Sequence, residues 1–409
     1  MRILIQGASI AGPVLAYWLL GRGFDVTVVE RAPALRKTGG HAVDLFRPAM
    51  EISERMGVLP RIEARATGTA TLTAHRKGAS RPTRIDYLKL EKTISDRHVE
   101  IMRDDLSEIY YDATRDDVSY IFDDEITAIS DDGEVSFRRS ALRRFDVVIG
   151  ADGLHSGVRQ LIFGQVPERF LGGYLSVVSV PKALARDGEM TGYFEPGRVA
   201  MIYTADHLDD ARAVFIFRPR TPLDYDHRDV ASQQIQLRSA LSGMSTEADR
   251  WLEEVDRTPT FYFDAITQLE MTSWSRGRVT LVGDAGYCPG PAVGGSTSLA
   301  VYGAYVLAGE IASAGGDHVA AFANYERIML PTVSGSRSLA RVNAKTIVPA
   351  SRMGVWALFG VARAVTALPL GVTQAVARLN RKGLRLYDSM PLPEYAESPE
   401  ASAAAGDSA

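Results

Sequence analysis

The sequence begins Met1-Arg-Ile-Leu-Ile-Gln-Gly7-Ala-Ser-Ile-Ala-Gly12, an apolar run followed by a glycine-containing turn. The apolar run predicts a buried parallel strand, and a helix is predicted after the turn, from Ala11 to Gly21. A second strand is predicted from Asp25 to Val29, and it ends on Glu30. This order of elements is typical of a dinucleotide-binding unit, in which a carboxylate about twenty residues after the turn accepts hydrogen bonds from ribose hydroxyls.

The small residues of the turn have steric roles. Gly7 forms the tight turn, and Gly12 lets the helix pack closely on the strand. Ser9 replaces the middle glycine of the usual pattern. The helix beginning at Ala11 presents free backbone N–H groups to a pyrophosphate. A strand–turn–helix of an ordinary α/β protein is the alternative interpretation of this stretch alone.

Length and composition narrow the class of protein. The 409 residues allow two or three domains, and a net charge of −4 gives no indication of a nucleic-acid partner. The single cysteine, Cys288, excludes an internal disulfide framework and favours a reducing cytoplasm. The first apolar run is split by Gln6-Gly-Ala-Ser, so we do not interpret it as a secretory signal. No closely spaced cysteines and histidines suggest a metal site.

The chain divides into segments of different character. Residues 1 to about 70, about 98 to 165 and about 271 to 340 have α/β patterns. Between them, residues 171–218 show short alternating runs, which predict a mostly antiparallel sheet. Outer strands are predicted at Thr69–Thr73 and Arg84–Leu90, a helix at Ser232–Glu254 and a strand at Thr260–Phe263. Helices follow from about residue 335, and residues 398–409 are small and polar, which predicts a disordered tail.

Three further segments carry polar residues at the ends of predicted strands. Arg144-Phe-Asp-Val-Val-Ile-Gly-Ala-Asp152-Gly153 is a strand that ends in Gly-Ala-Asp-Gly. Arg278-Val-Thr-Leu-Val-Gly-Asp284 also ends on a carboxylate, and a Pro/Gly loop from Pro291 to Ser296 then leads into a helix of small residues. In Glu100-Ile-Met-Arg103, a basic residue opens an amphipathic helix.

In the order of these motifs, residues 1 to about 340 resemble the class A flavoprotein monooxygenases, the group that contains para-hydroxybenzoate hydroxylase and the tetracycline-inactivating flavin enzymes. The resemblance implies a Rossmann-type FAD-binding domain of the α/β class with an inserted antiparallel-sheet substrate domain and C-terminal helices. It places FAD binding in residues 1–70, 98–170 and 271–340, substrate binding in 71–97 and 171–270, and a helical region in 341–397. The FAD-contacting residues that it implies are Gly7, Ser9, Ala11, Gly12, Glu30, Arg31, Asp44, Arg103, Asp152, Gly153, Asp284, Pro291, Gly294, Gly295 and Ser296.

The resemblance also implies how such an enzyme works. NADPH or NADH reduces the flavin, O2 adds at C4a, and the resulting hydroperoxide hydroxylates an aromatic or polycyclic phenol or enol. In the stretch Arg36-Lys-Thr-Gly-Gly-His-Ala-Val-Asp44, Arg36 would meet the nicotinamide nucleotide, and Asp152 and Gly153 would take part in handling both FAD and NAD(P)H. The sequence gives no basis for naming a catalytic acid or base, since the cofactor carries the chemistry.

Two segments depart from the family pattern, which usually continues Ala-Ala-His after the carboxylate and Pro-x-x-Gly-x-Gly-x-Asn in the loop. This chain has Ala285-Gly-Tyr287 and Pro291-Ala-Val-Gly-Gly-Ser-Thr-Ser298, which leaves Tyr287 and Ser298 as weak replacements. These departures support one alternative function, a flavin-binding accessory protein without turnover. A second alternative on the same scaffold is an FAD-dependent reductase or dehydrogenase of an isoprenoid-type substrate.

The C-terminal region has an asymmetric charge. From Arg327 to Tyr387 there are ten basic residues and no Asp or Glu. Three interpretations are open: a helix pair packed on an acidic face of the protein, a peripheral membrane contact that uses Trp356 and its apolar neighbours, or an entrance that attracts an anionic substrate or NADPH.

Overall fold

The N-terminal strand lies inside a six-stranded sheet. The computed structural model describes residues 1–35, 40–95, 97–258, 260–291, 295–379 and 385–396. The strand order is β17-β18-β11-β1-β2-β7, and all neighbours are parallel except β17 and β18. The strands span Arg2–Gln6 (β1), Asp25–Glu30 (β2), Ser119–Phe122 (β7), Val147–Gly150 (β11), Ser275–Arg276 (β17) and Val279–Leu281 (β18). The parallel strands, although far apart in sequence, therefore have their carboxyl ends at the same edge of the sheet.

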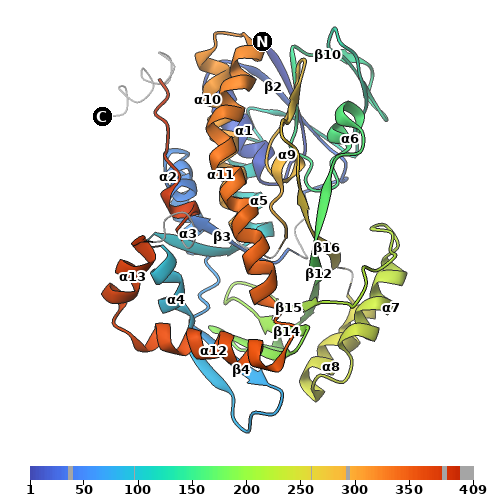
Figure 1. Cartoon of the computed structure of the whole chain (residues 1–409). Coiled ribbons are helices and arrows are strands. Elements are labelled where there is room, and N and C mark those ends of the chain that lie inside the picture. The colour runs from blue at the N-terminus through green and yellow to red at the C-terminus, as the bar shows by residue number, and fades with distance from the viewer. Residues whose placement is uncertain (36–39, 96, 259, 292–294, 380–384, 397–409) are drawn as a thin grey trace.

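Helices cover this sheet on its apolar faces. Helix α10 packs on both α1 and α11, and Ile3, Leu4 and Ile5 of β1 are fully buried. Figure 1 shows α1, α10 and α11 side by side. The helices of this part are α1 (Ala11–Leu20), α2 (Arg47–Arg55), α3 (Leu59–Ala64), α5 (Arg103–Asp112), α6 (Gly157–Phe163), α9 (Asp284–Tyr287), α10 (Ser296–Ser313) and α11 (His318–Ile347).

A second, seven-stranded sheet has the order β16-β12-β15-β14-β13-β4-β5. Its pairs are antiparallel except for the parallel pair β13–β4. Its strands are β4 (Thr71–Arg76), β5 (Thr83–Asp86), β12 (Glu168–Pro181), β13 (Glu189–Glu195), β14 (Arg198–Tyr203), β15 (Asp210–Phe217) and β16 (Phe261–Leu269). One apolar face packs on α7 (Val230–Leu241) and α8 (Thr246–Glu253), and the other packs on the end of α11 and on α12 (Arg352–Ala367).

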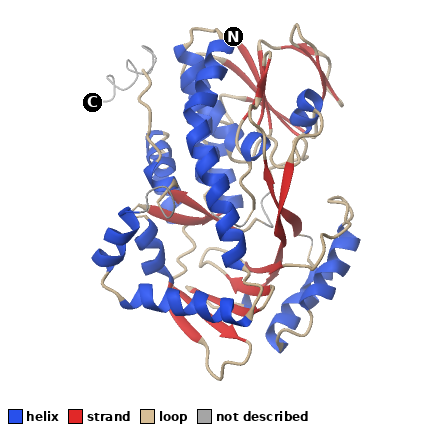
Figure 2. Ribbon diagram, in the orientation of Figure 1, coloured by secondary structure: helices blue, strands red, loops and turns tan. Residues whose placement is uncertain are grey.

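Two small sheets complete the architecture. Strands β3 (Ala42–Phe46) and β6 (His98–Met102) pair antiparallel, and a three-stranded sheet has the order β10-β9-β8. The latter contains β8 (Ile126–Ile129), β9 (Glu134–Phe137) and β10 (Arg143–Arg144). The remaining helices are α4 (Tyr87–Ile94) and α13 (Leu370–Leu379), with 3₁₀ turns at Lys182–Leu184, Glu254–Asp256 and Tyr387–Ser389. Figure 2 shows the strands in two main groups, with the long helix α11 extending from one toward the other.

The α/β fold predicted from the sequence is confirmed, while some elements differ. The predicted strand Arg84–Leu90 ends at Asp86, because the Asp86 carboxylate accepts a hydrogen bond from the Lys89 N–H at 3.0 Å and so caps helix α4. The predicted helix Ser232–Glu254 is two helices. It breaks where Gly243 has a φ of +76°, and Ser245 caps the second helix. The inserted sheet also contains one parallel pair, which the alternating pattern does not reveal.

The end of the described chain returns to the first domain. The Tyr302 hydroxyl donates to the Pro391 carbonyl at 2.7 Å, and the Tyr305 hydroxyl donates to the Pro393 carbonyl at 2.9 Å. Tyr395 donates to Glu310 at 2.8 Å. These contacts fasten the segment after α13 along helix α10.

Helices α12 and α13 have an unusual composition. No single helix among the described residues is long and apolar enough to cross a membrane, although α12 and α13 together reach the required hydropathy. They meet at a bend of 118°.

Candidate functional site

The turn after β1 is packed so closely that only glycine fits at two positions. Gly7 has a φ of +113°, and a Cβ there would lie 2.5 Å from the Ala151 carbonyl oxygen. A Cβ on Gly12 would lie 1.9 Å from the Gly7 carbonyl oxygen. The end of β1, the start of α1 and the end of β11 therefore meet without intervening side chains.

Glu30 holds this turn from the neighbouring strand. Its carboxylate accepts hydrogen bonds from the Ala8 N–H at 2.9 Å and the Ala32 N–H at 2.8 Å. Each carboxylate oxygen can accept a further bond. Because the carboxylate also lines a cavity, Glu30 both fixes the turn and offers acceptors to a ligand.

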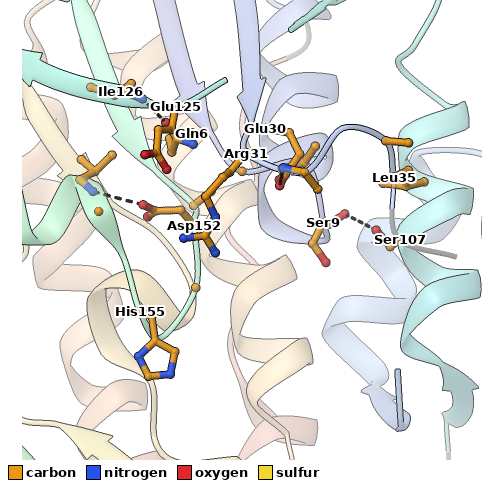
Figure 3. Close-up of a pocket in the computed structure, with 18 of the residues that line it drawn as sticks. Gln6, Ser9, Glu30, Arg31, Leu35, Ser107, Glu125, Ile126, Asp152 and His155 are labelled. Atoms are coloured by element: carbon orange, nitrogen blue, oxygen red, sulfur yellow. Dashed lines mark hydrogen bonds between the residues drawn. The ribbon is translucent and has the colours of Figure 1, made fainter. Parts of the chain in front are cut away.

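The cavity lies at the carboxyl ends of β1, β2 and β11 and has a volume of about 780 Å³. This is the usual place for a ligand in an open α/β sheet. Figure 3 shows Ser9, Glu30, Arg31 and Asp152 around it. Seven of the predicted FAD-binding residues line the cavity: Gly7, Ser9, Glu30, Arg31, Arg103, Asp152 and Gly153. Ala11 and Gly12 lie behind the turn, in the first residues of α1.

Asp152 also fixes the start of helix α6, whose N-cap residue is Ser156. The Ser156 hydroxyl donates to its carboxylate at 2.5 Å, and the Val158 N–H donates at 3.1 Å. Burial raises the pKa of this carboxyl, and the hydrogen bonds lower it again in part. Gly153, with a φ of +79°, completes the turn between β11 and α6. Asp152 therefore fixes the wall of the cavity even before a ligand binds.

Asp284 and Arg103, which lie 181 positions apart in the chain, interact electrostatically. Burial raises the pKa of the Asp284 carboxyl, and the positive charge of Arg103 lowers it in part. The nearby Cys288 thiol also lowers the pKa of the Asp284 carboxyl in part, while the hydrogen bond of this thiol goes to the Thr267 carbonyl at 3.9 Å. Since a buried carboxylate normally has several donors, Asp284 has capacity for the hydroxyl groups of a ligand.

The other predicted residues have different surroundings. Asp44 lies on β3 with its Oδ1 2.9 Å from His98 Nε2, and it is not among the residues that line the cavity. Gly295, with a φ of +75°, precedes α10 and faces the ring of Tyr387, since a Cβ there would lie 2.0 Å from the ring. Pro291 and Ser296 flank a stretch outside the described residues, to which Gly294 belongs, and Arg36 lies outside them as well.

The two weak candidates have structural roles. The Ser298 hydroxyl accepts from the Phe46 N–H at 2.9 Å and donates to the Asp44 carbonyl at 3.0 Å, so it ties β3 to α10. The Tyr287 hydroxyl is buried and accepts from the Tyr325 hydroxyl at 3.0 Å. Both residues therefore stabilise packing around the loop.

Three residues near the site were not predicted. Tyr262, from the second sheet, lines the cavity, and its ring lies 6.3 Å from that of His41. Burial and the nearby Arg103 charge lower the pKa of His41 to about 4, so this histidine is neutral at neutral pH. Tyr387 comes from the returning C-terminal segment. His41 lies in the same stretch as Arg36 and Asp44, but no local sequence signal marks Tyr262 or Tyr387 as site residues.

Comparison with known proteins places this geometry in a family. The model of a family described as an FAD binding domain matches residues 1–327. The chain belongs to the class A flavoprotein monooxygenases. It is 35% identical over 350 residues to a flavin-dependent monooxygenase of Legionella longbeachae, an alignment covering 82% of this chain and 87% of the relative. It is 41% identical over 332 residues to an uncharacterised protein of Mycobacterium tuberculosis, covering 79% and 88%.

A solved structure has the same architecture. The crystal structure of the tetracycline destructase Tet(55) matches this FAD-dependent monooxygenase with a TM-score of 0.80 and 33% identity, covering 96% of this chain and 98% of that one. The cavity fits FAD, because a turn without side chains and the Glu30 acceptor line it at the carboxyl ends of the strands, where dinucleotides bind in such sheets. Asp284 is not among the residues that line this cavity, so its contact with FAD stays a prediction.

The contacts of Glu30 lead to a prediction about FAD binding. Glu30→Ala should weaken FAD binding by about 1 to 3 kcal/mol. The substitution removes the acceptor of the Ala8 and Ala32 N–H groups, and it removes the acceptor of the FAD ribose hydroxyls as well. Asp25→Ala, at the exposed opposite end of β2, is the control and should leave the FAD dissociation constant unchanged. Fluorescence titration of FAD into the apoprotein measures both. An unchanged constant in Glu30→Ala would remove Glu30 from the site.

A second prediction separates two roles of Asp284. As a cofactor ligand, Asp284→Ala should give protein that is colourless or easily loses its flavin, whereas Asp284→Asn, which keeps an acceptor, should retain part of it. If Asp284 only caps the start of a helix, the Asp284→Ala variant should lose about 1 kcal/mol of its free energy of unfolding and keep its full flavin content. Titration of FAD into the refolded apo-variant distinguishes the roles, and a normal dissociation constant would exclude the ligand role.

Proposed function

We propose that this monooxygenase uses NAD(P)H and O2 to hydroxylate an aromatic or polycyclic small molecule that carries a phenol or enol. The observation that supports this most is the meeting of the two sheets at one cavity. Phe261 and Tyr262 of the second sheet line the same cavity as Gly7 and Glu30 of the first. A substrate held by the second sheet would therefore lie close to the cofactor.

The chain's own residues prepare this site for an oxidation. When bound, FAD supplies the redox chemistry, with oxygen transfer expected at its C4a position. Arg103 provides a fixed positive charge beside Asp284, where the cofactor phosphates and ribityl chain would lie. His41 is partly buried and neutral, so it can form hydrogen bonds without adding charge. The remaining task of the protein is to position the substrate and to exclude water.

The substrate class rests on the site and on one relative. Tyr203 is buried and Tyr262 is partly buried, and the two place aromatic rings beside residues 41 and 42. The Tyr203 hydroxyl accepts from the Ala42 N–H at 2.7 Å. Tet(55) is a tetracycline destructase, and tetracyclines are polycyclic phenol–enol compounds. We infer a substrate of similar chemistry for this chain, and we assign recruitment of the nicotinamide nucleotide to Arg36.

A direct assay tests the proposal. The purified protein should be yellow, and its NADPH oxidation under air should increase several-fold when a polycyclic phenol is added. With ¹⁸O2, one labelled oxygen atom should enter the product, as detected by mass spectrometry. Reduction of a substrate double bond without oxygen incorporation would instead indicate the reductase. Bound flavin without any stimulated NADPH oxidation would indicate an accessory protein, and either result would contradict the proposal.

A further inference from the structure

Helix α12 is apolar on two opposite faces. Its inner face packs through Val355 and Phe359 against the second sheet. Its outer face presents Met353 (82% exposed), Trp356 (51%) and Val361 (63%), and its other exposed residues, apart from arginines, are alanine and glycine: Ala357, Gly360, Ala364 and Ala367. A helix that is apolar all round normally lies inside a protein or at a lipid phase.

Helix α13 continues this pattern. Thr373 and Ala377 are buried, while Val372, Ala375, Val376 and Leu379 follow the i, i+3, i+4, i+7 spacing of one exposed helix face. Seven of the fifteen large apolar side chains exposed in the described part of the chain lie between Met353 and Leu379. Figure 1 shows both helices at the outside of the molecule, at the end away from the N-terminus. We call this the α12–α13 surface.

The charges around the α12–α13 surface are mainly positive. Arg352, Arg363 and Arg378 are exposed, and none has a carboxylate partner among the residues that the structure describes. The guanidinium of Arg76 lies 4.0 Å from the centre of the Trp356 ring. Asp86, at the start of the adjoining helix α4, is an exposed carboxylate nearby, and it is used as a helix cap. This pattern does not fit a helix pair held on an acidic face of the protein.

We propose that the α12–α13 surface docks on a bilayer that contains anionic phospholipid. Apolar side chains would enter the boundary between headgroups and acyl chains, and the arginines would contact the headgroup phosphates. Trp356 has the amphipathic side chain that is enriched at such boundaries. A second copy of the chain fits less well, because a two-fold interface would bring arginines of one copy against arginines of the other.

Vesicle flotation of the full-length, flavin-loaded protein tests this proposal. It should float with vesicles of phosphatidylcholine and phosphatidylglycerol, and much less with phosphatidylcholine alone. Val361→Glu combined with Val376→Glu should reduce the bound fraction about tenfold, because charge disfavours insertion. Val319→Glu combined with Ile235→Glu is the matched control, since these side chains are equally exposed on α11 and α7, and it should bind like the unchanged protein.

Other results would overturn the proposal. Absence of flotation with anionic vesicles would do so, as would equal flotation of the two glutamate double variants. The surface would instead belong to a second copy of the chain if three results came together. The protein would be a dimer in sedimentation velocity, the double variant Val361→Glu with Val376→Glu would be a monomer, and neither would bind lipid. If that variant does not fold, the double variant Arg363→Gln with Arg378→Gln tests the proposal in its place. Its binding to anionic vesicles should be weaker than that of the unchanged protein and less sensitive to salt. Flavin content and NADPH oxidation monitor the active site separately.

Discussion

The close approach of α1 to β1 is the constraint on which the rest of the site depends. The Cα of Gly12 lies so near the Gly7 carbonyl that no side chain fits between them, and Gly7 itself adjoins Ala151 at the end of β11. This packing brings the N-terminus of α1 to the edge of the sheet, directly behind the turn residues that line the cavity, where a helix N-terminus favours an anion. Glu30 then locks the turn through the Ala8 N–H. Replacing either glycine would displace the helix and with it the anion-binding end.

The second requirement is that distant parts of the chain meet at this edge. The Arg103 charge lowers the pKa of Asp284 in part, although the two residues begin helices in different parts of the chain. Ser298 ties the β3 strand to α10, and the returning segment places Tyr387 against Gly295. The second sheet contributes Tyr262. The site is thus formed where two sheets, a long helix and the C-terminal segment converge, which gives the cofactor and a substrate a common enclosure.

Local patterns predicted the parts of the site that depend on local geometry. Gly7, Gly12 and Glu30 belong to one continuous stretch, so spacing and residue size were enough to anticipate their arrangement. Arg103 and Asp284 carry little information alone, and only the resemblance to a family placed them together. Tyr387 and Tyr262 were missed, because their positions result from how distant segments pack. The strand expected at Arg84–Leu90 was wrong after Asp86, since a single side-chain cap outweighed the alternating pattern. The roles of Arg36 and Gly294 stay predictions, as both lie outside the described residues.

The central claim is that FAD occupies the cavity lined by the turn, Glu30 and Arg103, and that its ribityl chain reaches Asp284, which is not among the lining residues. A crystal structure of the purified protein with its bound flavin tests this most directly. The account predicts adenosine ribose hydroxyls within hydrogen-bonding distance of Glu30, the pyrophosphate at the N-terminus of α1, and ribityl hydroxyls at Asp284. Electron density for the flavin elsewhere, or a Glu30 carboxylate turned away from the ribose, would contradict it.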